Sequence, residues 1–532
     1  RKHSTTDDAT VGAGEDSVSC TDGGRSCDST RESPWASCSP PPSATVLPHR
    51  MVLRLGMPRR CLLSLALLVL CALFATASPA VVLNIDAYGA IAGSKSIDAV
   101  KKNSAAVTAA LNAAGTIAGP VTVEISSGKS YWALGGISGS NLHDVTFLVK
   151  GTLHALPDMK HWPLQESVGG TGVESDKETK GVEKTRYKHF LNFQNCYNLT
   201  ISGSSTYVYE PERTDMTASP PTSSLIDGQG VPWWNKYVIS TQHPQRPKLL
   251  FVSASEKVLI ENLTFLNSPS FHILLDDVAG VEVRYVHIQV DRSEQRRLKT
   301  VLRDRRRRLH GVVEDLLLQP EDLNTDGIDP SGRDVWVHDT TINNDDDSIA
   351  VKPCNAVKCT HSDCSKNMLF ERMRLTGFGA SIGSVPPASP ANCVRNITFR
   401  QIQMPGTGKG VYVKSNPDCG RQGGNQSAII DSILYEDINM TRPLWWAIWI
   451  GPQQQHEPGT ALGTKCPLDY PISKKCPTQG CVTFNNITLR RIFIDRPLLS
   501  PGVVLGNATN PMPSAVFDQV VVKDGGKWPF DQ

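Results

Sequence analysis

The densest group of residues that could do chemistry lies in the segment 324–353. Asp326 precedes a glycine there, and Asp345, Asp346 and Asp347 follow a short apolar strand. Carboxylates that are crowded and half buried repel one another, so the ionisation of one makes the next harder to ionise. Such a site can hold a protonated acid and an ionised base at the same pH. The segment therefore predicts acid/base chemistry.

Composition excludes several classes of protein for this chain. The 532 residues carry a formal net charge of +2, and 20% of them are charged. This balance predicts neither a nucleic-acid partner nor a disordered chain. An elongated all-β fold can use this length as one domain.

The first eighty residues differ from the rest. Residues 1–50 are rich in Ser, Thr, Asp and Gly and cannot bury a core, so we expect disorder or translated sequence upstream of the real start. Within 51–80, three arginines precede an apolar run at 61–74, and small residues follow at 75–80. This pattern predicts a secretory signal peptide. A membrane anchor is the alternative, but the run is shorter than the ~20 residues a span needs.

Sequons and cysteines support an extracellular or cell-wall location. N-x-S/T sequons occur at seven positions, Asn198, Asn262, Asn396, Asn425, Asn439, Asn486 and Asn507. Five of the fourteen cysteines precede the expected cleavage point, and most of the remaining nine should pair, with one left over. The close spacing of Cys354, Cys359 and Cys364, and of Cys466, Cys476 and Cys481, favours local disulfide loops over zinc sites.

The region 81–532 alternates short β-rich runs with Gly, Asn, Asp and Pro clusters. Helical periodicity is confined to 103–114, which predicts a helix capping the N-terminal end. Similar runs begin at seven positions, Val258, Val281, Val335, Met368, Val394, Ile430 and Val482. A short repeat that cannot bury its apolar face alone must stack on its neighbours. We therefore predict a parallel β-helix, right-handed by crossover preference, rather than a β-sandwich.

One charged segment, 292–318, interrupts this repeat. It contains a run of arginines followed by an apolar stretch. It could bind an acidic polysaccharide, but charge runs are more often solvated, so a solvated insertion or an error in the gene sequence is the favoured interpretation.

Four motifs resemble those of glycoside hydrolase family 28, the polygalacturonases and rhamnogalacturonan hydrolases. They are Asn324-Thr-Asp-Gly, Asp346-Asp347, Gly377-Phe-Gly-Ala-Ser-Ile-Gly-Ser and Tyr412-Val-Lys-Ser, in the family's order and approximate spacing. Supporting segments such as Asp227-Gly-Gln-Gly and Arg246-Pro extend the resemblance over most of 81–522. It implies a β-helix that hydrolyses α-glycosidic bonds in pectin with inversion.

The resemblance also implies roles for residues. Asp346 would protonate the leaving oxygen, Asp326 and Asp347 would activate water, and Asn324 would help to hold that water. One coil of about twenty residues separates Asp326 from Asp346, and adjacent strands lie ~4.8 Å apart. Inverting enzymes usually keep ~6.5–9.5 Å between carboxyl groups. Either the side chains splay outward or the family departs from that rule.

Two positions depart from the family pattern. Phe378 stands where the family usually has His, and Tyr412 where it usually has Arg. Lys414 remains as a point charge that could bind substrate, and the two rings could lie against sugar rings. Rhamnogalacturonan hydrolases also lack that His and keep a Lys-Ser-Asn segment like the one that begins at Lys414. Asp345, where the family usually has Gly or Gln, is expected to raise the pKa of its neighbour.

Aromatic and histidine residues near these motifs have structural interpretations as well. Trp445, Trp446 and Trp449 could line the groove, although packing is the commoner role for such residues. His272 is expected to be a structural histidine. A calcium site on the acidic cluster is a further alternative.

The leading hypothesis is a secreted, monomeric pectin hydrolase without a cofactor. The alternatives are a rhamnogalacturonan hydrolase, a lyase on the same fold and a β-helix that binds polysaccharide without cleaving it. The sequence predicts no metal, no nucleic acid and no lasting membrane anchor.

Overall fold

The computed structural model describes residues 81–165, 186–204, 209–210, 223–239, 245–291, 293, 324–416, 427–454, 466, 470, 476–478 and 480–525. The predictions for 1–50, for the signal peptide at 51–80, for Asn425 and for nearly all of 292–318 lie outside these residues. In the part of the chain that is described, no helix has the length and apolar character needed to cross a membrane.

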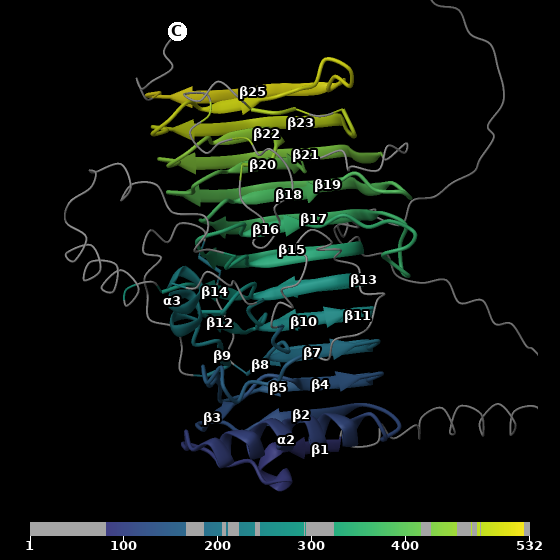
Figure 1. The fold of residues 1–532 in the computed structure, drawn as a ribbon, viewed down its shortest axis with the longest axis vertical. Helices are drawn as coiled ribbons and strands as arrows, with labels where there is room; N and C mark the ends of the chain where they lie inside the picture. The colour runs from purple at the N-terminus through teal and green to yellow at the C-terminus, as the bar shows by residue number, and fades with distance from the viewer. Residues whose placement is uncertain are drawn as a thin grey trace, which may run out of the picture. The chain divides into compact units, whose positions relative to one another are not determined.

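Long strands stack in parallel and in register, one per coil. They are β13 (Ile273–Arg284), β15 (Ile328–Asn343), β17 (Ser365–Leu375), β19 (Asn392–Pro405), β21 (Ala428–Thr441), β23 (Val482–Asp495) and β25 (Ala515–Lys523). Val281 pairs with Val335, which pairs with Met368, and the row continues to Ile397 and Ile433. These side chains are buried. Figure 1 shows the stack from β13 to β25, and the predicted parallel β-helix is confirmed.

A second row of short strands forms another face of the later coils. It contains β16 (Ile349–Val351), β18 (Ala380–Val385), β20 (Val411–Ser415), β22 (Ile448–Pro452) and β24 (Gly502–Val504), paired in parallel. Inward side chains such as Ile349 and Val411 fill the core. The residues just before these strands form stacked loops, and those loops carry the acidic residues.

The earlier coils repeat the same plan with shorter strands. Their strands are β1 (Val81–Asn84), β2 (Val121–Ile125), β3 (Ser130–Ala133), β4 (Ile137–Ser140), β5 (His143–Val149), β6 (Thr152–Ala155), β7 (Leu191–Gln194), β8 (Tyr197–Gly203), β9 (Leu225–Asp227), β10 (Leu250–Ser253), β11 (Glu256–Glu261), β12 (Thr264–Leu266) and β14 (His287–Gln289). A 3-10 turn, η1 (Ile85–Tyr88), follows β1, and a helix not expected from the sequence, α3 (Val231–Ile239), follows β9.

The capping helix is longer than predicted. Helix α2 runs from Ile97 to Ala114 rather than from Asn103, because the side chain of Ser96 accepts a hydrogen bond from the backbone N–H of Ala99 and caps the helix there. Asn103 is a buried residue within α2, and its amide contacts backbone groups of Ile91 and Trp132. A polar residue that joins the helix to the first coils was therefore mistaken for a helix start.

The coils turn at single residues with left-handed backbone. Asn198, Asn396 and Asn486 occupy one such corner, with φ of 54°, 55° and 49°. Asparagine tolerates this conformation better than most residues. Its side chain also bonds the adjacent coil, as when Nδ2 of Asn198 donates to Asp144 over 2.6 Å. Corner geometry alone thus accounts for asparagine at three of the predicted sequons, so their glycosylation stays a prediction.

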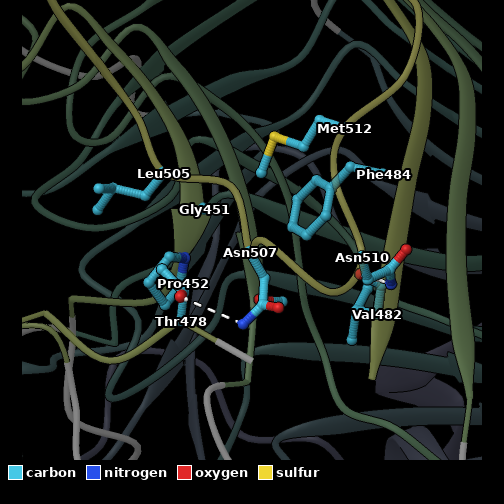
Figure 2. A pocket seen from close by; sticks show the side chains of 10 residues that line it. Gly451, Pro452, Thr478, Val482, Phe484, Leu505, Asn507, Asn510 and Met512 are labelled. Carbon is cyan, nitrogen blue, oxygen red and sulfur yellow. Dashed lines mark hydrogen bonds between the residues drawn. The ribbon is translucent and has the colours of Figure 1, made fainter. Parts of the chain in front are cut away.

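Glycan occupancy should follow exposure. Asn198, Asn396, Asn439 and Asn486 are exposed, whereas Asn507 is half-buried. Figure 2 shows Asn507 in a small hollow near Phe484 and Met512, where its Nδ2 donates to Oγ1 of Thr478 over 3.3 Å. We expect glycan at the exposed sites and little at Asn507, measured by ¹⁸O labelling of deglycosylated peptides. Equal occupancy at Asn507 and Asn439 would contradict this.

The disulfides agree in part with the predicted local loops. Cys354 pairs with Cys359 and Cys466 with Cys476, but Cys364 pairs with Cys393 on the next coil. Cys196 is free and buried, which matches the expected unpaired cysteine. Cys364 lies next to Cys393 only because neighbouring coils stack, so its spacing in the sequence did not reveal the pair.

Candidate active site

The three predicted catalytic aspartates come together at the start of two strands. Asp326 precedes β15, and Asp346 and Asp347 precede β16. The loops stack because the N–H of Gly327 donates to the carbonyl of Asp347 over 2.9 Å. One oxygen from each aspartate lies within 4.8 Å of the others, and the exposed fractions of the three residues are only 3%, 4% and 1%. Stacking of coils thus gathers carboxylates that are twenty residues apart.

The side chains do not splay outward. Carboxylate oxygens within 4.8 Å of one another are closer than the ~6.5–9.5 Å usual for inverting enzymes. Of the two possibilities left open by the sequence, the structure therefore shows closely spaced carboxyl groups. Spacing alone does not assign this site to inversion, so the stereochemical outcome must be measured.

Asn344 holds the acidic loop, a role that the sequence did not reveal. Its Nδ2 lies 3.0 Å from the carbonyls of Thr325 and Asp346 and 2.9 Å from that of Asp347, and its Oδ1 accepts from the hydroxyl of Ser348. One buried amide thereby joins two coils. The sequence feature that could have indicated this role is the position of Asn344 directly before three aspartates.

Gly377 must be glycine at this point. Its φ is +52°, and a Cβ there would lie 2.1 Å from the carbonyl oxygen of Asp346. The N–H of Phe378 donates to that same carbonyl over 2.8 Å. The glycine motif therefore supports the backbone of the acidic loop from the next coil.

Asp347 is held by an ion pair and a hydrogen bond. Its Oδ2 lies 2.5 Å from Nζ of Lys414, and its Oδ1 accepts from the hydroxyl of Ser381 over 2.7 Å. Burial lowers the pKa of Lys414, but the charge of Asp347 raises it and prevails. Lys414, predicted to bind substrate, has a buried side chain that contacts one of the predicted catalytic carboxylates, and its role in binding substrate stays a prediction.

Asp346 accepts two backbone hydrogen bonds. The N–H of Asp347 donates to Oδ1 over 2.9 Å, and the N–H of Asn324 donates to Oδ2 over 2.8 Å. Such bonds favour the ionised form of a carboxyl group. Asn324 is thus near the site, and its own Oδ1 accepts from Arg246 over 3.3 Å.

Asp326 has the opposite environment. Its Oδ1 is buried without a hydrogen-bond partner, and Nζ of Lys352 is 3.8 Å from Oδ2. Burial first, and then the charges of Asp329 and Asp346, raise the pKa of Asp326 well above its usual range. Asp329 is fully buried 3.3 Å from Lys352, and burial raises its pKa to about 6. Neither Asp329 nor Lys352 is among the site residues predicted from the sequence.

The lysines disfavour a calcium site. Lys414 and Lys352 place ammonium groups 2.5 Å from Asp347 and 3.8 Å from Asp326. A divalent cation on these carboxylates would face two positive charges at close range. The protein's own side chains thus supply the counter-charge.

The predicted stacking of Phe378 and Tyr412 on sugar rings is wrong for this structure. Both rings are 0% exposed and pack in a cluster with Trp445, Trp446 and Trp449. The outward face of β20 and β22 is covered at this point, so these aromatics are packing residues. Sequence shows that a ring points outward from a strand, but not that other side chains cover it.

His272 is a structural histidine, as expected. It is 0% exposed, and Nδ1 lies 3.0 Å from the carbonyl oxygen of Asp326 while Nε2 accepts from the N–H of Ser268 over 3.2 Å. Burial lowers its pKa to about 4. The neutral ring therefore holds the backbone on which Asp326 sits.

Comparison with known proteins gives a family match over the part of the chain that contains this site. The family model for Glycosyl hydrolases family 28 matches residues 212–465, which include all three aspartates and both lysines. The buried cluster described above therefore lies within the matched residues.

Individual relatives of this chain are distant. It is 23% identical over 250 residues to an endo-polygalacturonase of Pectobacterium carotovorum subsp. carotovorum, covering 43% of the chain and 51% of the relative. It is 24% identical over 251 residues to a probable endopolygalacturonase A of Neosartorya fischeri, covering 47% and 56%. The chain thus spans about half the length of the curated relatives it matches.

Solved structures agree on the fold. A polygalacturonase from Erwinia carotovora ssp. carotovora superposes with a TM-score of 0.52 at 19% identity, covering 84% of this chain and 97% of that one. An endo-xylogalacturonan hydrolase from Aspergillus tubingensis gives 0.52 at 17% identity, covering 83% and 92%. At these identities the likeness supports the β-helix alone.

Proposed function

We propose that this chain hydrolyses α-glycosidic bonds in a pectic polysaccharide by acid/base catalysis with inversion. The observation that carries the proposal is the cluster of Asp326, Asp346 and Asp347, three buried carboxyl groups with unequal partners. Unequal environments are what separate a proton donor from a base at one pH. The names of the relatives, endo-polygalacturonases, support the substrate class.

Division of roles within the cluster is testable. The resemblance assigns the proton donor to Asp346 and the activation of water to Asp326 and Asp347. Without substrate, however, two backbone N–H groups favour ionised Asp346, and burial favours protonated Asp326. Comparing the cleavage of substrates with good and poor leaving groups in Asp346→Asn and Asp326→Asn decides between them, because a good leaving group rescues only the variant that lacks the general acid.

The experiment that tests the function is product analysis on polygalacturonate, rhamnogalacturonan and xylogalacturonan. Hydrolysis releases reducing ends, and Asp346→Asn should lose that release. Proton NMR of the first product reads inversion or retention directly. Full activity in Asp346→Asn would sink the assignment, unsaturated products absorbing in the ultraviolet would indicate a lyase, and binding without cleavage would indicate a non-catalytic β-helix.

Substrate choice depends on the cations at the site. Lys352 has a side chain that is 24% exposed, whereas that of Lys414 is 6% exposed. A uronate carboxylate at the site would therefore meet Lys352 first. Rhamnogalacturonan remains the alternative polymer, and relative rates on the panel distinguish the two.

We further propose a secreted protein that acts as a monomer. Disulfides such as Cys354–Cys359 and Cys364–Cys393 need an oxidising compartment to persist. Fractionation of the producing cells and light scattering of the purified protein test these two points.

A further inference from the structure

Lys409 is a buried lysine that the hydrolysis mechanism does not use. Its side chain is 0% exposed, and Nζ has no hydrogen-bond partner. Four aromatic rings surround it instead: the Nζ-to-centroid distances are 4.0 Å to Tyr412, 5.1 Å to Phe378, 5.1 Å to Trp445 and 5.6 Å to Trp449. Ring faces attract ammonium ions, and several faces around one ammonium form an aromatic cage.

The backbone is shaped to place Lys409 in this cage. Glycines flank it, and a Cβ on Gly408 would lie 2.7 Å from the ring of Phe378. A Cβ on Gly410 would lie 2.3 Å from Sδ of Met440. The chain can therefore pass this close to the ring of Phe378 and to Met440 only with glycine at both positions beside the lysine.

Tyr412 links the cage to the catalytic cluster. Nζ of Lys409 lies 4.0 Å, and Nζ of Lys414 4.4 Å, from the centroid of its ring. Lys414 in turn lies 2.5 Å from Asp347. One ring thus contacts two ammonium groups, and the second of them contacts a proposed catalytic carboxylate.

The charges that act on Lys409 come from strand β20 and from the acidic loop before β16. Lys414 repels it, whereas Asp347 and Asp346 attract it. Burial and Lys414 together lower the pKa of Lys409 well below its usual range. A lysine in this position destabilises the folded protein whenever it is protonated. A residue that lowers stability in this way is a candidate for a functional role.

We propose that Lys409 is a positioning residue for hydrolysis: held among the four rings, it fixes the ring of Tyr412, against which Lys414 lies, and so directs Lys414 at Asp347. The proposal rests on the proposed function. Lys414 is the cation that lies 2.5 Å from Asp347, so its direction sets the surroundings of that carboxylate.

The test is Lys409→Met, which keeps the length of the side chain and suits an aromatic cage. We expect the unfolding midpoint to rise, because a desolvated amine is removed. We expect kcat/KM to fall at least about tenfold at acidic pH, with the acid limb of its pH profile moved to higher pH, because Lys414, no longer fixed through Tyr412, is directed less well at Asp347. Lys366→Met, at a surface ion pair with Asp363, is the matched control and should change neither.

Two outcomes would overturn the proposal. A higher midpoint with an unchanged pH profile would mean that the amine has no role, and a lower midpoint with equal loss of activity at every pH would mean that Lys409 only packs. A readout without activity separates this from the proposed function: Lys409→Met and Asp347→Asn should be non-additive in a double-mutant cycle on the unfolding midpoint. If the wild-type protein cleaves no polymer, the proposed function is wrong. If the changes in unfolding midpoint of the two single variants add up to that of the double variant, the link between Lys409 and Asp347 is wrong.

Discussion

Asp326→Asn should abolish hydrolysis while leaving the protein folded and no less stable. The loss expected for one acid/base group is about 10²- to 10⁴-fold in kcat/KM. The amide fits because Oδ1 of Asp326 has no hydrogen-bond partner to lose, and its Oδ2 is 3.8 Å from Lys352. Reducing-end release on the preferred polymer measures the loss, and thermal unfolding measures the fold.

The direction of the stability change follows from the pKa of Asp326. Its pKa in the folded protein is raised, so folding loses stability as pH rises from the ordinary carboxyl range of about 3.9 through the folded pKa. An amide cannot ionise, so Asp326→Asn does not lose this stability. The thermal unfolding midpoint of Asp326→Asn should therefore equal or exceed that of wild type at pH 7. Asp363→Asn, at a surface ion pair with Lys366, is the control and should keep its activity. Comparable activity in Asp326→Asn and wild type would remove Asp326 from the catalytic set.

Lys352→Met should be the most destabilising of the single substitutions considered. Lys352 lies 3.3 Å from Asp329 and 3.8 Å from Asp326, two aspartates with exposed fractions of 0% and 3%. Removing one partner from a buried charge cluster costs about 3–5 kcal/mol. Because the Lys352 side chain is 24% exposed, we expect the lower end of that range at pH 7, measured by urea unfolding.

This loss should depend on pH. Burial raises the pKa of Asp329 to about 6, so its ionised form costs stability above the unfolded value near 3.9, and the cost is complete above about 6. Without Lys352 the ionised carboxylates lack a counter-charge, so they lower the stability of the folded protein further at neutral pH. This destabilisation disappears once the carboxyl groups are protonated in the folded protein. Lys352→Met should therefore approach wild type near pH 4. Lys358→Met, 4.0 Å from Asp276 at the surface, is the control and should stay within about 0.5 kcal/mol. Equal destabilisation at both pH values would point to lost packing instead.

The sequence by itself determined the repeat and the catalytic residue types. Alternating apolar runs can bury their faces only by stacking, so the parallel coils followed from runs such as those at Val281 and Val335. The order of the four motifs pointed to Asp326, Asp346 and Asp347, and the structure gathers them within 4.8 Å. Both conclusions rest on local pattern, which a chain shows before it folds.

Only the tertiary structure decided what surrounds those residues. Lys352 lies 3.3 Å from Asp329 because neighbouring coils stack, and a spacing of 23 residues in the sequence does not reveal this contact. Burial of Phe378 and Tyr412 likewise depends on tryptophans of a later coil. The period of the strands fixes which side of a sheet a residue faces, but what covers that side is set by side chains from other coils.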